Sequence, residues 1–490
     1  METKKSREQE KTPFLDAYKA YLESDPVPFD VPGHKLGNFE TDLSRKLSPC
    51  FSKYDANAPI GLDNLYHAKG VIKEAEDLAA KACHADHCLF SVNGTTGAIL
   101  TRFRSTLHAK DKVIRPRNIH KSVVNGLILS GATPIFVNPF IDEELGVACQ
   151  RRRDDLIKAR DENKDAKAVF IINPTYFGVT SDLKKIVEEA HNRNRIVRCD
   201  EAHGSNFYFS SKLPVSARQA GADITARSRH KNSGSLTQTS LLLVKGKRID
   251  RLEVKRAFAR FSSTSPYHPL MASLDAARKE RALHGKEILD RCLELSKYAR
   301  EHLNKIPGIH VYDKDYIKKW NTTGVFDIDL TKLVIDVRGL GRFGYDVYKE
   351  IRKESNIQLE LGEVSVVLAI VGPGTTKEHI DRLIQAFERL SKEHYKEGKK
   401  LSVLRYRYTY PIRRRIPRTA YDDPYKILPL KDAVGEISEE TIRAYPPGIP
   451  IILPGEEISK DTITRINFYR REKGQILKDT KEGWIKVVVR

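Results

Sequence analysis

The chain has 490 residues, 40% of them hydrophobic, and its 85 Lys and Arg outnumber its 65 Asp and Glu, giving a formal net charge of +20. A single hydrophobic core stops growing at roughly 250 to 300 residues, so this length predicts two or three domains. The charged N-terminus is unlike a secretion signal, and no run approaches the ~18 apolar residues of a membrane span, which favours a cytoplasmic protein. The six cysteines lack CxxC or Cys/His ligand spacing, which argues for reduced thiols and against a structural metal site.

The net charge of +20 makes nucleic-acid binding a hypothesis to weigh. The densest basic cluster spans 405–418, where arginines are interleaved with tyrosines that could stack on bases or hold phosphates. We favour a solvated connector or an oligomer contact for this segment, because elsewhere the basic residues are mostly interspersed with acids. A salt-dependent shift with DNA or RNA would distinguish the two hypotheses.

The chain begins with a segment, 1–70, that is predicted to be irregular. Within it, PGHKLG (32–37) is predicted to be a fixed loop, because Gly and Pro flank its His and Lys. From Val71 the pattern is helical. A short apolar run at 88–92 then predicts a strand that leads into NGTTG (93–97). A strand, a Gly-containing turn and a helix start form an anion site, because free backbone N–H groups and the helix dipole face the ligand.

Short apolar runs alternate with helical patterns as far as residue 245, which predicts a mainly parallel sheet covered by helices. Helical patterns at 270–283 and 287–306 end at Pro307-Gly308, a stop signal. Strand and helix patterns are mixed beyond it, which predicts a smaller α+β domain. The predicted parts are an N-terminal interface segment (1–70), a large domain (71–306), a small α+β domain (307–400) and a C-terminal domain (401–490).

Two predicted strands end in side chains that could act together. Asp200 closes the strand RIVRCD, and Lys231 follows the apolar start of DITARSRH. In an open α/β sheet, ligands bind at the carboxyl ends of strands. An amine and a carboxylate at such ends are what pyridoxal 5'-phosphate (PLP) requires, because the lysine holds its aldehyde covalently and the carboxylate keeps its pyridinium nitrogen protonated.

These motifs carry a family resemblance. SRHK (228–231) followed by GSLTQTS (234–240), together with DEAHG (200–204), resembles the Orn/Lys/Arg decarboxylase family of fold-type-I PLP enzymes, and the likeness is closest to its short bacterial biosynthetic arginine decarboxylases. Further stretches agree, in the family's order: VPGHKLG (31–37), VNGTTG (92–97), RNIHKS (117–122), NPTYFG (173–178), STSP (263–266) and YPPGIPIILPGE (445–456).

The resemblance implies an aminotransferase-like large domain and PLP-dependent decarboxylation of a basic amino acid. The reaction expected first is L-arginine to agmatine and CO2 in polyamine biosynthesis, and lysine or ornithine, giving cadaverine or putrescine, remain alternatives. Another fold-type-I reaction, such as transamination or aldol cleavage, would reuse Lys231 and Asp200, and is distinguished by release of a keto acid instead of CO2.

The resemblance also implies roles for single residues. Lys231 would carry PLP and Asp200 would pair with the pyridine nitrogen. The ring of His120 would stack on the cofactor, and His203 would lie near its phenolic oxygen or the substrate. After CO2 departs, Cα must be reprotonated by a nearby acid, for which Lys231 and His230 are the candidates.

The phosphate of the cofactor is expected to lie between two chains. In the family, a Ser or Thr of the STSP segment of the neighbouring subunit completes the phosphate site, which here means Ser263 or Thr264, so a homodimer or higher oligomer with shared active sites is expected. The residues implied within one chain are Thr95, Thr96, Ser228 and His230.

Two further sets of residues bear on the substrate. A guanidinium or ammonium terminus needs a carboxylate, for which Glu456 and Glu457 are the candidates. Arginines depart from the family pattern at positions where buried charge would be costly, so each is expected to pair with an acid or to mark a local change. These arginines are Arg102, Arg104, Arg198, Arg227 and Arg229.

Overall fold

The structure is a computed structural model that describes residues 7–39, 41–47, 50–57, 59–142, 144–145, 147–150, 153–320, 323–401, 409–445, 449–471 and 474–489. The chain forms two compact units. Unit 1 comprises Met1–Thr106 and Ile196–Leu289, and unit 2 comprises Leu107–Arg195 and Asp290–Arg490. This division cuts through the predicted 71–306 domain, and the predicted boundaries stay predictions. Among the described residues, no helix has the length and apolar character to cross a membrane.

The N-terminal segment of unit 1 is more helical than predicted. Helix α2 begins with a proline in its first turn, a position that tolerates the missing N–H. Phe14 and Tyr18, one turn apart, are buried against the ring of His268 at 5.7 and 6.0 Å. An irregular segment was therefore the wrong prediction here, because this pair gives the helix an apolar face. The helices are α2 (Pro13–Glu23), α3 (Asp42–Leu47), α4 (Cys50–Lys53), η1 (Leu65–His67) and α5 (Val71–Ala82).

Unit 1 contains four neighbouring strands in the order β1-β10-β9-β8. They are β1 (His87–Ser91), β8 (Ile196–Asp200), β9 (Ile224–Ser228) and β10 (Ser240–Val244). All four were predicted, and β8 and β9 are parallel. However, β10 is antiparallel to both β9 and β1. Only a loop, without a crossover helix, joins β9 to β10, and a parallel pair would require such a crossover.

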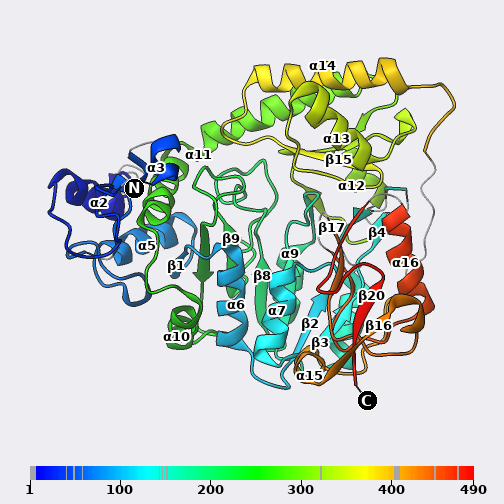
Figure 1. The fold of residues 1–490 in the computed structure, drawn as a ribbon, viewed down its shortest axis with the longest axis horizontal. Helices are drawn as coiled ribbons and strands as arrows, with labels where there is room; N and C mark the ends of the chain where they lie inside the picture. The colour runs from blue at the N-terminus through cyan, green and yellow to red at the C-terminus, as the bar shows by residue number, and fades with distance from the viewer. Residues whose placement is uncertain are drawn as a thin grey trace. The chain divides into compact units, whose positions relative to one another are not determined.

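Two further helices and the N-terminal part of a third belong to unit 1. Helix α6 (Gly94–Thr106) packs beside α10 (Arg251–Phe261), as Figure 1 shows. The two helical patterns predicted beyond residue 270 form one continuous helix, α11 (His268–Leu303). Gly285 lies within it, where a Cβ would come within 2.9 Å of Phe209, so the glycine allows close packing and does not end the helix.

Unit 2 contains three parallel strands in the order β6-β2-β3, as the βα pattern predicted. They are β2 (Lys112–Pro116), β3 (Thr133–Val137) and β6 (Ala168–Ile172), with helices α7 (Lys121–Ser130), α8 (Arg153–Glu162) and α9 (Leu183–His191). Helix α9 is capped by Asp182, whose side chain accepts a hydrogen bond from the amide of Lys185. Two short pairs are β4 (Ile141–Asp142) with β5 (Val147–Ala148), and β7 (Val179–Thr180) with β12 (Asp327–Ile328).

The predicted α+β region of unit 2 is built on an antiparallel sheet in the order β11-β13-β15-β14. Its elements are β11 (His310–Val311), α12 (Asp315–Trp320), β13 (Lys332–Asp336), η3 (Arg338–Leu340), α13 (Gly344–Ser355), β14 (Leu361–Gly362), β15 (Val366–Ile370) and α14 (Lys377–His394). Helix α14 begins with a capping box formed by Thr376 and His379.

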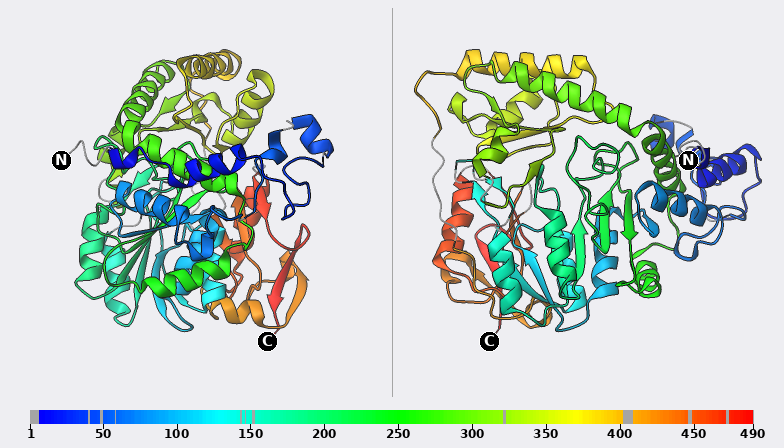
Figure 2. Two further views of the ribbon diagram at one scale, coloured as in Figure 1. Left: turned by 90° about the vertical axis from the view of Figure 1, so that its left-hand side faces the viewer. Right: turned by 180° about the vertical axis from the view of Figure 1, so that it is seen from behind.

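The C-terminal part of unit 2 contributes most of an apolar core in which Ile442, Ile452 and Ile485 are fully buried, and Tyr345 and Val364 of the α+β region join this core. Helix α16 packs on β18 and β19 (Figure 2). The elements are α15 (Pro417–Asp422), β16 (Tyr425–Pro429), η4 (Leu430–Asp432), β17 (Ile442–Tyr445), β18 (Ile449–Ile452), α16 (Lys460–Arg471), β19 (Gln475–Leu477) and β20 (Trp484–Val488).

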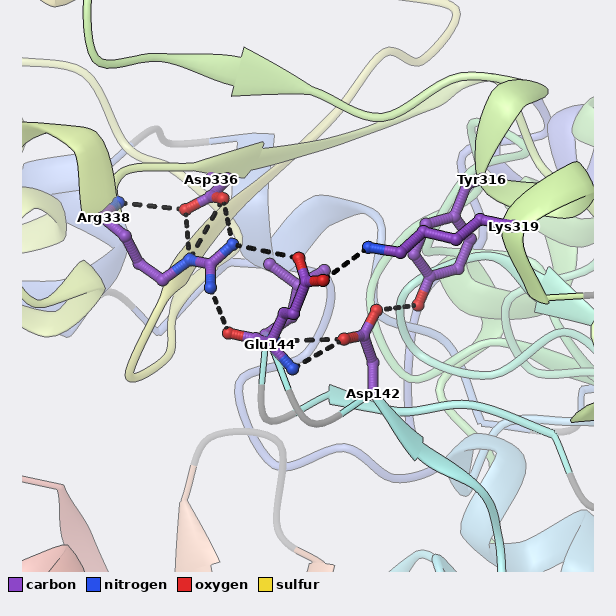
Figure 3. A network of polar contacts seen from close by, with 7 residues as sticks. Asp142, Glu144, Tyr316, Lys319, Asp336 and Arg338 are labelled. Carbon is purple, nitrogen blue, oxygen red and sulfur yellow. Dashed lines mark hydrogen bonds and ion pairs between the residues drawn. The ribbon is translucent and has the colours of Figure 1, made fainter. Parts of the chain in front are cut away.

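Within unit 2, polar contacts fasten the β4-β5 hairpin to the α+β sheet (Figure 3). The hydroxyl of Tyr316 donates to Asp142 at 2.8 Å, and Lys319 donates to Glu144 at 2.8 Å. The guanidinium of Arg338 donates to the backbone carbonyl of Glu144. The hydrogen bond from Lys319 lowers the pKa of the Glu144 carboxyl. The hairpin is therefore held by side chains from α12 and η3, which sequence patterns did not reveal.

Candidate functional site

Lys231 and His203 come together in unit 1, beyond the carboxyl ends of two parallel strands. His203 follows β8 and Lys231 follows β9. The Nζ of Lys231 lies 2.8 Å from Nε2 of His203, a hydrogen-bond distance. The side-chain amide of Asn232, the residue after Lys231, donates to the carbonyl of His203 at 3.0 Å. This hydrogen bond fixes the backbone of His203 against the segment that carries Lys231. The amine and the imidazole therefore form a preorganised pair.

Asp200 is the last residue of β8 and is 5% exposed. Its Oδ1 accepts the amide of Ala202 at 3.2 Å. The buried guanidinium of Arg102 donates to the carbonyl of Cys199. Burial lowers the pKa of Arg102 to about 10, and the charge of Asp200 counters part of that shift. The departure from the family pattern at Arg102 thus places a cation near the predicted cofactor carboxylate.

Two hydroxyls predicted to contact the phosphate also meet in unit 1. Oγ1 of Thr95, in the first turn of α6, lies 2.5 Å from Oγ of Ser228 at the end of β9. Both side chains are buried, whereas Thr96 is exposed. Gly94 has φ +64°, and a Cβ there would meet nothing within 4 Å. There is thus free space at Gly94, the first residue of α6, and two hydroxyls lie at this end of the helix, an arrangement that suits an anion.

The two other predicted histidines are fixed by local hydrogen bonds. Nδ1 of His230 lies 2.9 Å from the carbonyl of Thr239. Because a carbonyl only accepts, Nδ1 of His230 is the nitrogen that carries the proton. In unit 2, His120 caps α7, where its Nδ1 accepts the amide of Ser122 at 3.2 Å. The ring of His120 is exposed, and its stacking on PLP stays a prediction.

Ser263 and Thr264 follow α10 and are exposed. Oγ of Ser263 accepts the amide of Ser265 at 3.1 Å. Both side chains are thus accessible to a second subunit, and their contact with a neighbouring phosphate stays a prediction.

Glu456 and Glu457, the candidate substrate carboxylates, both form ion pairs in unit 2. Glu456 is 1% exposed, and its two oxygens accept hydrogen bonds from the guanidinium of Arg117, one of them at 2.6 Å. Its Oε2 also accepts the amide of Leu453 at 2.9 Å. Burial raises the pKa of the Glu456 carboxyl, and Arg117 counters part of the rise. Glu457, which is partly exposed, accepts from Arg414 at 2.6 Å. The substrate role of either residue stays a prediction.

Replacement of Glu456 by glutamine separates a structural role from a substrate role. We expect Glu456→Gln to destabilise the protein by about 3 to 5 kcal/mol, because Arg117 would be left buried without its anion. The matched variant Glu457→Gln should cost at most about 1 kcal/mol, since its pair with Arg414 is partly exposed. Thermal denaturation measures both. A variant that keeps its melting temperature but raises KM for the amino acid identifies the substrate carboxylate instead.

The family of this chain is shown by sequence comparison. Residues 12–378 match the family model "Orn/Lys/Arg decarboxylase, major domain", and residues 415–475 match "Orn/Lys/Arg decarboxylase, C-terminal domain". The chain belongs to the Orn/Lys/Arg decarboxylase family. It is therefore an amino-acid decarboxylase of a PLP-dependent family, as the motifs around Lys231 and Asp200 predicted.

Relatives within this decarboxylase family are similar over nearly the full chain. An arginine decarboxylase of Halalkalibacterium halodurans is 39% identical over 468 residues, covering 94% of this chain and 93% of that protein. An arginine decarboxylase of Bacillus subtilis is 39% identical over 462 residues, with the same coverage. The solved lysine decarboxylase of Francisella novicida aligns with a TM-score of 0.83 at 20% identity, over 97% of this chain and 81% of that one. At this identity the likeness concerns the fold alone, and it confirms the predicted fold class.

We predicted that the arginines that depart from the decarboxylase pattern pair with acids or mark local change. Two of them have contacts of another kind. Arg198 has its Cζ 4.0 Å from the ring of Phe103, and Arg229 donates to the carbonyl of Ala277 at 3.0 Å. An aromatic face and a backbone carbonyl thus help to solvate these two buried cations. A sequence pattern does not identify such partners, because they lie far apart in the chain.

The described part of the arginine-tyrosine segment makes contacts within the decarboxylase itself. Arg414 pairs with Glu457, and Arg415 pairs with Asp423. Arg418 donates to the carbonyl of Ile128, near the C-terminus of α7, at 2.7 Å, where a helix leaves carbonyls without partners. These contacts support the interpretation of a connector. Residues 405–408 of the same cluster lie outside the described residues.

Proposed function

We propose that this chain decarboxylates L-arginine to agmatine and CO2, in the service of polyamine biosynthesis, with PLP linked to Lys231. The observation that carries the chemistry is the contact between Lys231 and His203 beyond the parallel strands β8 and β9. The substrate is inferred from the relatives that are named arginine decarboxylase and are 39% identical along 94% of this chain.

The residues of unit 1 fit the cofactor. An amine is present for the aldehyde and a carboxylate, Asp200, for the ring nitrogen. Two buried hydroxyls, those of Thr95 and Ser228, stand 2.5 Å apart at the N-terminus of a 13-residue helix, where a phosphate would be stabilised by the helix dipole. When bound, PLP supplies an electron sink for the charge that remains when CO2 leaves the substrate.

The remaining chemistry is proton transfer by the chain's own side chains. The Nζ of Lys231 lies at a hydrogen-bond distance from Nε2 of His203, so a proton can be held between the two groups. His230 is less suited as the acid in its neutral form, because its proton is on Nδ1 and is donated to the carbonyl of Thr239. We therefore assign the reprotonation of Cα to Lys231, with His203 as its partner.

Substrate choice depends on the terminus of the side chain. A planar guanidinium pairs best with a carboxylate in bidentate geometry, whereas an ammonium is a point charge. We expect that, with equal concentrations of arginine, lysine and ornithine and with PLP in excess, agmatine exceeds cadaverine and putrescine by at least about 100-fold. Quantification of the three amines by mass spectrometry measures this ratio. A dominant yield of cadaverine or putrescine would assign the substrate to lysine or ornithine.

The active unit is proposed to be a dimer or a higher homo-oligomer. Large apolar side chains in the N-terminal segment are exposed, among them Val27, Phe29 and Ile60, with 80%, 92% and 103% exposed. Exposed large apolar side chains concentrated in one segment are a feature of interaction sites. A second copy of this chain is the occupant that we propose, since most oligomers are symmetric and Ser263 and Thr264 are exposed in the same unit.

Shared active sites predict complementation between inactive chains. Mixed with a Ser263→Ala, Thr264→Ala chain, a Lys231→Ala chain should form heterodimers with one intact site each. Random pairing then restores about a quarter of wild-type activity, because half of the dimers are mixed and each has one good site. The control places all three substitutions in one chain and mixes it with a Lys231→Ala chain, which should stay inactive. No recovery between chains that demonstrably exchange would exclude a shared site.

A further inference from the structure

Arg227 is a buried cation that the proposed chemistry does not use. It lies in β9 immediately before Ser228 and is fully buried. Because successive side chains of a strand point to opposite faces, its guanidinium faces away from the Ser228 hydroxyl. Its Nε donates to Oγ of Ser205 at 3.2 Å, its Nη2 to the carbonyl of Ser205, and its Nη1 to the sulfur of Cys83 at 2.8 Å. Two of these three donors are directed at a single residue, Ser205.

Aromatic rings from the same segment cover this guanidinium. The Cζ of Arg227 lies 3.9 Å from the ring centroid of Tyr208 and 5.3 Å from that of Phe209. Tyr208 is itself fixed, because its hydroxyl donates to Glu201 at 2.6 Å. The other oxygen of Glu201 accepts the amide of Ala217 at 2.7 Å. Burial raises the pKa of Glu201 to about 7, and these two hydrogen bonds counter part of that rise.

All of these partners except Cys83 and Ala217 belong to the segment 201–209, which follows Asp200 and carries His203. This segment is also joined to the neighbouring strand, because Oγ of Ser205 donates to the carbonyl of Ser228. Ser205 therefore links the guanidinium of Arg227 to the backbone of the residue whose hydroxyl meets Thr95. The position of segment 201–209 therefore affects two parts of the site: the hydroxyl pair of Thr95 and Ser228, and the imidazole of His203 beside Lys231.

We propose that Arg227 is a positioning residue for the cofactor: through Ser205 and Tyr208 it holds segment 201–209 against β9, and thereby aligns His203 with Lys231. Arginine suits this position because its planar fork donates in several directions while its flat face stacks on a ring, which lysine does not reproduce. The inference rests on the proposed function, in which Lys231 and Ser228 contact PLP.

The first test replaces the donors and keeps the apolar bulk. In Arg227→Met we expect the dissociation constant of PLP to rise by about 10- to 100-fold, by analogy with the loss of metal affinity when the hydrogen-bond partners of metal ligands are removed. Titration of PLP into the apoprotein, followed by absorbance or fluorescence, measures this constant. The pH midpoint of the absorbance change of the bound cofactor should also shift, because the imidazole beside Lys231 is no longer aligned. Arg227→Lys should recover only part of both effects.

Because a buried arginine variant can fail to fold, two serines provide a milder, matched comparison. Ser205 and Ser240 are both fully buried, and each hydroxyl donates to a backbone carbonyl of β9: Ser205 to Ser228, and Ser240 to Arg227 at 2.8 Å. Ser205→Ala should raise the dissociation constant of PLP several-fold and shift the pH midpoint. Ser240→Ala should lower the melting temperature similarly and leave both PLP measurements unchanged.

The outcomes separate this inference from the proposed function. Equal effects of the two serine variants on PLP affinity, or no effect of Ser205→Ala, would show that Arg227 and Ser205 only stabilise the fold, and would overturn the inference alone. A wild-type protein that does not bind PLP would overturn the proposed function together with the inference.

Discussion

Replacement of Lys231 by alanine is expected to lower turnover by at least about 10,000-fold, because the proposed covalent link to the cofactor and the proposed proton donor would be lost together. The fold should persist, since Lys231 is only partly buried. Borohydride reduction followed by peptide mass spectrometry measures the link directly. The wild-type protein should carry a pyridoxyl group on Lys231.

The control for this experiment is Lys247→Ala, an exposed lysine that follows β10 in the same unit. It should keep both the adduct and the activity. An adduct that survives in Lys231→Ala, on any other lysine, would show that the cofactor lysine has been misassigned.

The second large effect is expected for Asp200→Asn. The amide keeps the shape of the carboxylate, so PLP should still bind through Lys231 and the hydroxyls of Thr95 and Ser228. The ring nitrogen would lose the anion that keeps it protonated, and we expect kcat to fall by about 100- to 1,000-fold, the loss typical of one removed electrostatic contact in an active site. Steady-state kinetics and a PLP titration on the same preparation measure the two quantities separately.

Asp223→Asn is the matched control, because Asp223 is also buried and accepts a backbone amide, that of Val197, at 2.7 Å. It precedes β9 and therefore lies at the end of that strand opposite to Ser228. Its loss should reduce stability and leave kcat unchanged. Near-normal turnover in Asp200→Asn, or an equal fall of kcat in both variants, would remove Asp200 from the cofactor site.

The sequence predicted those parts of the fold that depend on local pattern. Every strand of unit 1 and every parallel strand of unit 2 was predicted within one or two residues, because buried strands are short apolar runs bounded by turns. The direction of β10 was not predicted, since periodicity reports burial and says nothing about the partner strand. Helix α2 was missed because only Phe14 and Tyr18 bury its face, too short a pattern to separate from the charged residues around it.

In the candidate site, too, residues within motifs could be predicted and long-range contacts could not. Lys231, His203, Thr95 and Ser228 could be named from motifs, and the structure brings them together in two pairs. The surroundings of Arg227 could not be named, because its partners are a hydroxyl, a carbonyl, a thiol and two rings, which leave no charge pattern in the sequence. The sequence showed only that Arg227 stands in an apolar strand. A buried charge needs polar or aromatic partners, but the sequence does not say which residues provide them.

The measurement that tests the central claim most directly is the fate of arginine labelled with 13C at its carboxyl carbon, incubated with the PLP-loaded protein in D2O. The account predicts one 13CO2 for each agmatine formed, with one deuterium at the carbon that bore the carboxylate, because decarboxylation replaces that group by a solvent-derived proton. Retention of the label in a keto acid, with no 13CO2 released, would contradict it and assign the site to transamination.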